Sequence, residues 1–336
     1  MRKAHIIQLL ATALLAAMLM PGCKKEEEDV VLPSLDGYIY TVVYPYLRQM
    51  PPEHDESVPG IRIEGVTHPE GGEIGYYWKI SPTMEKYDTL DAGSNLIPFD
   101  RMLEKLGGTL TEPGAYSLIS AAYAKGYYST SQALTFYIVD PSVDGSLTGT
   151  GLRIGLFGGE VISDPRDSKE NDYYTTTHDG LSWMRNNLAW TGAGIPLYDC
   201  EVMSYPFGRF YTWDEAQTAC PEGWRLPSAA EWDALGDAAG NLMCNARFFE
   251  ETMWEYWPQV KITNSTLMSV VPSGYAVKGD YNAYTGFKQF AAFWTADADP
   301  DDTSMAQYRY INVNRPEIFK ASADKATFCA SVRCVK

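Results

Sequence analysis

The stretch that decides the fold is residues 208–232, which read GRFYTWDEAQTACPEGWRLPSAAEW. Thr212 precedes Glu215 by three positions, and Ser228 precedes Glu231 by the same spacing. Each pair fits a capping box, in which the hydroxyl accepts a hydrogen bond from the third helical amide and the glutamate accepts one from the amide of the cap. The stretch therefore predicts two short helices in close succession.

A sharp stop separates these two helices. The first must end near Cys220, because Pro221 disfavours helical geometry for the residue before it. Trp224 and Leu226 then alternate with Arg225, so a short extended piece directs two apolar side chains to one side. We expect the two helices to pack around a buried tryptophan, with Cys220 placed to be tied to another part of the chain.

Length and charge narrow the class of protein. A chain of 336 residues is long enough for two domains, each with its own core. A formal net charge of −16 argues against a nucleic-acid partner and against electrostatic binding to anionic lipid. The acidity fits a soluble, secreted protein.

The first residues predict export and a lipid anchor. A basic start at Arg2 and Lys3 precedes the apolar run of residues 6–20, which is too short to span a bilayer comfortably. Gly22 directly before Cys23 resembles the bacterial lipoprotein signal, with residues 1–22 removed and the lipid on Cys23. An ordinary secretory signal with an incidental cysteine is the alternative.

The charged run that follows Cys23 bears on where the protein is displayed. Residues 23–35 carry this run and read as a solvated tether. The acidic part of this run resembles the signal by which lipoproteins of the Bacteroidetes are displayed on the outer face of the outer membrane. We expect an outer-membrane protein exposed at the cell surface, and the periplasmic leaflet remains the alternative.

Residues 36–141 predict an all-β domain. Runs of β-branched and aromatic residues alternate with clusters of Pro, Gly, Asp and Ser, as in a β-sandwich. Trp78 is the expected centre of the core. The pattern resembles PKD or Ig-like modules, and no residue in it suggests chemistry. The Gly/Ser-rich residues 142–151 are the predicted linker to a second domain over residues 152–336.

Four blocks of this second domain carry a family resemblance. They are residues 179–190 (DGLSWMRNNLAW), residues 208–232, residues 293–296 (FWTA) and residues 331–336 (SVRCVK). In this order they resemble the Fibrobacter succinogenes major paralogous domain family of surface proteins. The resemblance implies an α+β C-type-lectin-like fold, related to the formylglycine-generating enzymes. The whole chain is thus predicted to be multi-domain, an Ig-like or PKD-like sandwich followed by this domain.

The resemblance also implies a disulfide between Cys220 and Cys334. Three further cysteines of the second domain are left over, so Cys329 could bridge Cys244 or Cys200, or stay a buried thiol. A different hypothesis is that Cys329 and Cys334 resemble the copper-binding pair of formylglycine-generating enzymes, which would make the protein a copper-dependent oxidase. The Arg-Gly-Gly-Ser-Trp block of those enzymes is missing, and a bridge to Cys220 would break the pair.

No cofactor is predicted, and besides the copper hypothesis the sequence offers one candidate for calcium. Asp297, Asp299 and Asp301 lie close together, and carboxylate oxygens suit Ca²⁺. An EF-hand loop would need Gly at position 302 and Glu at position 308, where the chain has Asp302 and Tyr308. A solvated acidic loop is the alternative.

Residues 264–289 occupy the place of the long ligand-carrying loop in the implied fold. Tyrosine and asparagine provide flat contact surface and adaptable hydrogen bonds at low entropic cost. The candidate ligand-binding residues are Asn264, Tyr275, Tyr281, Asn282 and Tyr284. We expect non-catalytic binding of a glycan or a surface protein. The alternatives are a plain surface loop and, for the whole protein, a structural or anchoring component of a surface assembly such as a pilus.

Overall fold

The computed structural model describes residues 31–42, 46–47, 60–106, 114–138, 152–153, 160–167, 171–199, 201–249, 251–280 and 282–336. The predicted signal peptide, Cys23, the predicted linker, Cys200 and Tyr281 lie outside the described residues. The described chain is mostly β, with several small antiparallel sheets and a few short helices. None of the helices described is both long and apolar enough to cross a membrane.

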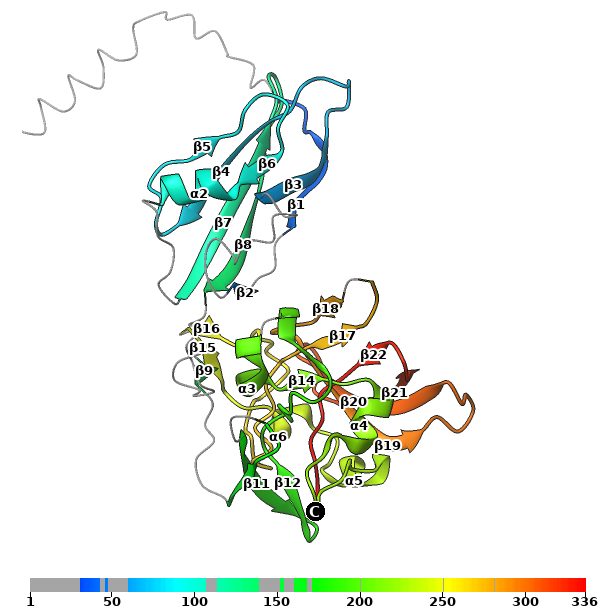
Figure 1. Cartoon of the computed structure of the whole chain (residues 1–336). Coiled ribbons are helices and arrows are strands. Elements are labelled where there is room, and N and C mark those ends of the chain that lie inside the picture. The colour runs from blue at the N-terminus through cyan, green and yellow to red at the C-terminus, as the bar shows by residue number, and fades with distance from the viewer. Residues whose placement is uncertain are drawn as a thin grey trace, which may run out of the picture.

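The N-terminal unit, residues 31–138, is built from two sheets (Figure 1). One has the order β1 (Asp36–Val42), β3 (Gly60–Thr67), β6 (Leu96–Pro98). The other has the order β2 (Tyr46–Leu47), β8 (Thr130–Ile138), β7 (Gly114–Tyr123), β4 (Gly75–Ser81), β5 (Asp88–Thr89). A short helix, α2 (Phe99–Lys105), follows β6.

One apolar core lies between these two sheets. Ile61 and Ile63 of β3 face it from one sheet, and Trp78 and Leu118 face it from the other. In β4 the buried residues Trp78 and Ile80 alternate with more exposed neighbours, which is the period of two expected for a strand with one face in a core. Trp78 is completely buried, as the sequence predicted.

The C-terminal unit, residues 152–336, combines many short elements. Its strands are β9 (Leu152–Arg153), β10 (Val161–Asp164), β11 (Asn171–His178), β12 (Leu181–Met184), β13 (Ile195–Pro196), β14 (Arg209–Phe210), β15 (Arg247–Phe248), β16 (Glu251–Thr252), β17 (Tyr275–Val277), β18 (Ala283–Thr285), β19 (Phe290–Ala298), β20 (Met305–Asn312), β21 (Ile318–Asp324) and β22 (Phe328–Cys329). Its helices are η1 (Leu197–Asp199), η2 (Glu201–Met203), α3 (Ser204–Phe207), α4 (Trp213–Ala219), α5 (Ala229–Ala234) and α6 (Ala239–Leu242).

Both predicted capping boxes are present, at the starts of α4 and α5. The Ser228 amide donates to Glu231 Oε2 at 2.7 Å, and the Glu231 amide donates to Ser228 Oγ at 3.2 Å. Hydrogen bonds from Arg225, and from the amide and hydroxyl of Ser228, lower the pKa of Glu231 to about 2. Trp232 of α5 is buried against Trp183 and Phe293, as expected of a buried tryptophan in this stretch. Ala216 and Ala219 of α4 belong to a different cluster, with Trp294, so the two helices do not pack around one tryptophan as predicted.

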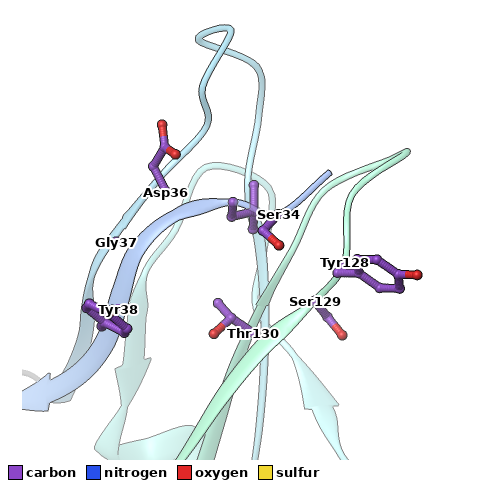
Figure 2. A pocket seen from close by; sticks show the side chains of 8 residues that line it. Ser34, Asp36, Gly37, Tyr38, Tyr128, Ser129 and Thr130 are labelled. Atoms are coloured by element: carbon purple, nitrogen blue, oxygen red, sulfur yellow. The ribbon is translucent and has the colours of Figure 1, made fainter. Parts of the chain in front are cut away.

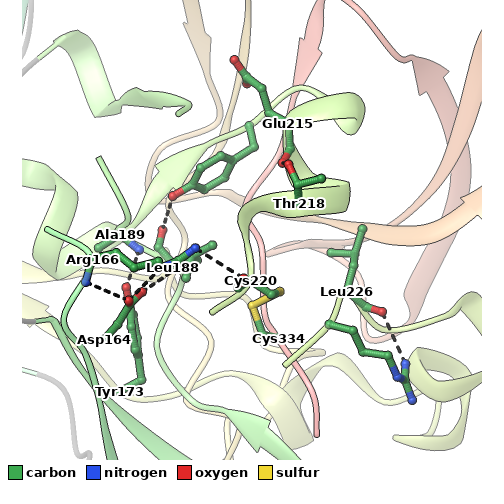
Figure 3. Close-up of a disulfide and its surroundings, with 12 residues drawn as sticks. Asp164, Arg166, Tyr173, Leu188, Ala189, Glu215, Thr218, Cys220, Leu226 and Cys334 are labelled. Carbon is green, nitrogen blue, oxygen red and sulfur yellow. Dashed lines mark hydrogen bonds and ion pairs between the residues drawn. A yellow bond between two sulfur atoms is a disulfide. The ribbon is translucent and has the colours of Figure 1, made fainter. Parts of the chain in front are cut away.

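The disulfide between Cys220 and Cys334 is also present (Figure 3). It joins the end of α4 to the final segment of the chain, with the two Cα atoms 5.8 Å apart and 114 positions between them in sequence. Val335, next to Cys334, forms bridges to both Trp183 and Arg225. The last segment therefore runs between the β11–β12 hairpin and the stretch of residues 208–232.

A buried arginine lies beside this disulfide in the final segment. Arg333 is 1% exposed and donates to the backbone carbonyls of Met184, Arg185 and Met268. Its Nε donates to Asn187 Oδ1 at 2.7 Å. Burial lowers its pKa. This one side chain holds three segments that no continuous sheet joins.

The two units meet at Tyr137, near the end of β8. Its side chain is 2% exposed and packs in a cluster of the C-terminal unit, with its ring centroid 4.7 Å from that of Phe248. Its hydroxyl donates to Glu251 Oε2 at 2.7 Å, and Lys288 Nζ lies 2.5 Å from the same oxygen. Burial and this carboxylate raise the pKa of Tyr137, so the phenol stays protonated.

Candidate functional site

The structure brings two of the five predicted ligand-binding residues together. Tyr284 lies in β18, and Asn282 directly precedes this strand. Both side chains contact Asp199 of η1. Tyr275 lies in the neighbouring strand β17 opposite Thr285, and Asn264 lies in a separate loop, so neither contacts Asp199 in the hydrogen bonds described. Tyr281 lies outside the described residues. The candidate site is therefore the cluster of Tyr198, Asp199, Asn282 and Tyr284, which we call the η1–β18 cluster.

Hydrogen bonds to Asp199 organise the η1–β18 cluster. The Tyr284 hydroxyl donates to Asp199 Oδ1 at 2.6 Å, and Asn282 Nδ2 donates to the same oxygen at 3.0 Å. The Asp199 amide donates back to the Tyr284 hydroxyl at 3.2 Å. The Tyr198 and Tyr284 ring centroids lie 5.1 Å apart. Residues more than eighty positions apart in sequence thus form one polar and aromatic group.

The backbone of η1 is strained within this cluster. Tyr198 has φ of 55° and Asp199 has φ of 53°, so two consecutive residues with side chains adopt the left-handed conformation. Such residues cost about 1–3 kcal/mol each and persist only where the surroundings over-determine them. Here Leu197 anchors the segment in the core, and Tyr284 holds both the amide and the carboxylate of Asp199.

The two phenols of the cluster are neutral. Burial raises the pKa of Tyr198 to about 12, and burial together with the Asp199 carboxylate raises that of Tyr284 further. The Asp199 residue itself is exposed. The cluster thus offers an exposed carboxylate, an amide and two ring surfaces, which are groups suited to binding hydroxyl-rich or peptide ligands.

Asn264 and Tyr275 make structural contacts, and their role in ligand binding stays a prediction. Asn264 accepts from the Ser269 amide at 2.8 Å and donates to the Ser269 hydroxyl at 3.1 Å, so its side chain closes a turn of its own loop. The Tyr275 ring packs between Phe290 and Phe328. Both side chains are used inside the fold.

Sequence reasoning missed Tyr198 and Asp199. They lie in a segment without periodicity, where the sequence carries no sign of a left-handed backbone, which glycine normally adopts. Proximity to β18 is a tertiary feature. A Tyr–Asp pair in an irregular stretch was the only available signal.

The predicted calcium site is not formed. Asp297 Oδ2 accepts from the Ala229 amide at 2.5 Å, and Asp299 Oδ1 accepts from the amides of Asp301 and Asp302. Asp297 thus meets the first amide of α5, and Asp299 shapes a local turn and also accepts from the Ser322 hydroxyl. Within the described residues, no group of three His, Cys, Asp or Glu side chains is placed to hold a metal ion.

The remaining cysteines correct two predictions. Cys244 and Cys329 are both buried free thiols, so the predicted Cys329–Cys244 bridge is wrong, and Cys329 bridges no other cysteine either. Cys329 sits in β22 with its thiol toward the Thr327 carbonyl, and burial raises the pKa of each thiol to about 12. Cys334 is consumed by its bond to Cys220, so the proposed copper-binding pair does not exist.

Comparison with known proteins adds one finding. Residues 157–336, more than half of the chain, match the Fibrobacter succinogenes major domain. No significant match was found among curated proteins or solved structures. The match covers α4, α5, the disulfide and the η1–β18 cluster, and it begins beyond the N-terminal unit. The chain therefore belongs to the Fibrobacter succinogenes major domain family.

Proposed function

We propose that the protein is a surface-displayed lipoprotein whose C-terminal unit binds a glycan or a protein without catalysis, through the η1–β18 cluster. The lipid on Cys23 would anchor it in the outer membrane. In this proposal the N-terminal unit is an Ig-like or PKD-like module that carries a C-type-lectin-like domain. Two sheets around one apolar core support the former, and two capped helices tied by a disulfide to the last segment support the latter.

The strained backbone of the η1–β18 cluster carries the proposal. Two consecutive left-handed residues are destabilising, and the hydrogen bonds of Tyr284 fix them in one arrangement. That arrangement holds the exposed Asp199 carboxylate beside two aromatic rings. A preorganised group of this kind binds with a small entropic cost.

Binding to an array of neutral, acidic and basic glycans and of surface-protein extracts tests the proposal. We expect at least one specific ligand, which Asp199→Asn and Tyr284→Phe each weaken about tenfold or more, because each change removes hydrogen-bonding capacity without removing a ring. Tyr256→Phe, at an exposed tyrosine of the same unit outside the cluster, is the matched control. Equal binding by the wild type and both cluster variants would reject the site.

The junction at Tyr137 favours a second candidate function, a structural or anchoring component of a surface assembly. Tyr137 fixes the N-terminal unit to the cluster of apolar residues against which Tyr198 and Tyr284 also pack. A fixed union of two units suits a protein that transmits load. One stoichiometric protein partner, recovered after cross-linking on intact cells and lost with Tyr137→Ala, would favour this function over glycan binding.

A further inference from the structure

A cavity of about 440 Å³ opens in the N-terminal unit, far in sequence from the η1–β18 cluster. It lies between the start of β1 and the turn that joins β7 to β8 (Figure 2). Tyr38 and Tyr128 lie on opposite sides of it, and Thr130 lies between them. The residues that give it its chemistry are Ser34, Asp36, Tyr38, Tyr128, Ser129 and Thr130.

The cavity exists because the chain changes partner at this point. Ser34 forms a parallel bridge to Tyr128, whose amide donates to the Pro33 carbonyl at 2.9 Å. The chain then leaves the turn between β7 and β8 and pairs with β3 as strand β1. The two edges diverge, and the space between them is the cavity.

Gly37 makes this divergence possible. Its φ is +85°, and a Cβ atom there would lie 2.1 Å from the carbonyl oxygen of Gly65. The pairing of β1 with β3 shifts register between Gly37 and Tyr40. The cavity wall is thus set by a backbone arrangement that only glycine allows, so the cavity is formed before any ligand arrives.

Two exposed tyrosine rings lie among polar side chains at this cavity. Tyr38 is 88% exposed and Tyr128 is 51% exposed, so both rings present apolar surface to solvent. Ser34, Ser129, Thr130 and Asp36 also line the cavity, and Leu35 beside them is buried. Among the described residues that line the cavity, none is a lysine, arginine or histidine.

We propose that this cavity binds a neutral saccharide. Exposed tyrosine rings offer flat surface to the C–H face of a sugar ring, and hydroxyl and carboxylate oxygens accept from sugar hydroxyls. A volume of about 440 Å³ falls in the range of small-ligand sites and accommodates one or two sugar units. Asp36, with no cation among the described lining residues, repels uronic acids and sulfated sugars.

Calorimetric titration of the whole protein with neutral oligosaccharides of glucose, mannose, xylose and galactose tests this site. Oligogalacturonate and heparin oligosaccharides are the acidic comparators. We expect binding of at least one neutral series, and Tyr38→Ala and Tyr128→Ala each weaken it at least tenfold. Because both rings are largely exposed, neither change is expected to lower the melting temperature.

Tyr256→Ala is the matched control, because Tyr256 is 86% exposed and lies outside the cavity. It leaves neutral-saccharide binding unchanged. Any part of the binding that Asp199→Asn removes belongs to the η1–β18 cluster, and the part that Tyr38→Ala removes belongs to this cavity. Asp36→Asn weakens the neutral ligand and relaxes the exclusion of the acidic ones. Absence of binding to all four neutral series, or unchanged binding in the Tyr38→Ala/Tyr128→Ala double variant, would overturn the proposal.

Discussion

The two units of the molecule satisfy the hydrogen bonds of their buried backbone groups in different ways. In the N-terminal unit long neighbouring strands, such as β7 and β8, satisfy each other's backbone groups, and its core cluster is made of apolar residues. In the C-terminal unit most strands are short, and the core buries Arg185, Arg209 and Arg333. The irregular unit also carries the disulfide.

The difference teaches where buried charge is needed. Every buried carbonyl requires a donor, and a sheet supplies donors automatically. Where the chain runs irregularly, one guanidinium with five N–H donors can satisfy several carbonyls at once. Arg333 does this for Met184, Arg185 and Met268, and Arg209 does it for the carbonyls of Ala193 and Gly194.

Removal of the disulfide is expected to change the stability of the C-terminal unit, relative to the N-terminal unit, more than any other substitution proposed. The double change Cys220→Ala and Cys334→Ala frees a loop of 114 positions and lowers the free energy of unfolding of the C-terminal unit by about 4 kcal/mol. Hydrogen exchange measured peptide by peptide reads each unit separately, and we expect residues 114–138 to be little changed.

The matched control removes two sulfur atoms that form no bond. Cys244→Ala with Cys329→Ala is expected to cost only about 1–2 kcal/mol, because small cavities replace the two thiols. Equal losses in the two double variants would show that the cross-link contributes nothing beyond packing.

Arg333→Met is expected to have the next largest effect. Methionine fills similar space but leaves the carbonyls of Met184 and Met268 without this donor, at a cost of about 3 kcal/mol to the C-terminal unit. Chemical denaturation with the same exchange readout measures it. Arg315→Met, at an exposed arginine of the same unit, should change stability by less than about 0.5 kcal/mol. A comparable loss in both variants would contradict the role assigned to Arg333.

The smallest effect concerns Glu231 and pH. Its pKa of about 2 in the folded protein lies below its ordinary value of 4.5, so it stabilises the fold above pH 4.5. That stabilisation is lost as the pH falls from 4.5 toward 2, and with screening at a partly exposed group it amounts to about 1–2 kcal/mol. Glu231→Gln is expected to remove this contribution to the free energy of unfolding at neutral pH. The fall in stability between pH 4.5 and pH 2, which is the acid limb of the stability curve, should then be smaller than in the wild type.

Glu222→Gln, at an exposed glutamate of the same segment, is the control for the pH experiment. It should reproduce the acid limb of the wild-type stability curve. An unchanged acid limb in Glu231→Gln would mean that the capping box of α5 does not respond to pH in this range.

Local patterns explain which features could be predicted. The capping boxes at Thr212 and Ser228 depend on contacts three residues apart, and the burial of Trp78 follows from alternation along one strand. The pairing of Cys220 with Cys334 came from a family resemblance, and the structure has it. For the candidate site, Asn282 and Tyr284 were named together with Asn264 and Tyr275, because all four lie in the place of the ligand-carrying loop of the resembled fold and are of residue types suited to binding. Only the structure shows that Asn282 and Tyr284 meet at Asp199.

The sequence by itself determined the two capped helices, the tryptophan centre of the N-terminal core and the acidic character of the surface, because each depends on neighbouring residues or on composition. Only the tertiary structure decided that Asp199 meets Tyr284, that Tyr137 joins the two units and that the chain opens a cavity beside Tyr38. These contacts link distant segments through left-handed backbone, a buried ring and a change of strand partner. Each of these contacts forms only when segments distant in sequence come together in the folded chain, so no local sequence pattern predicts it.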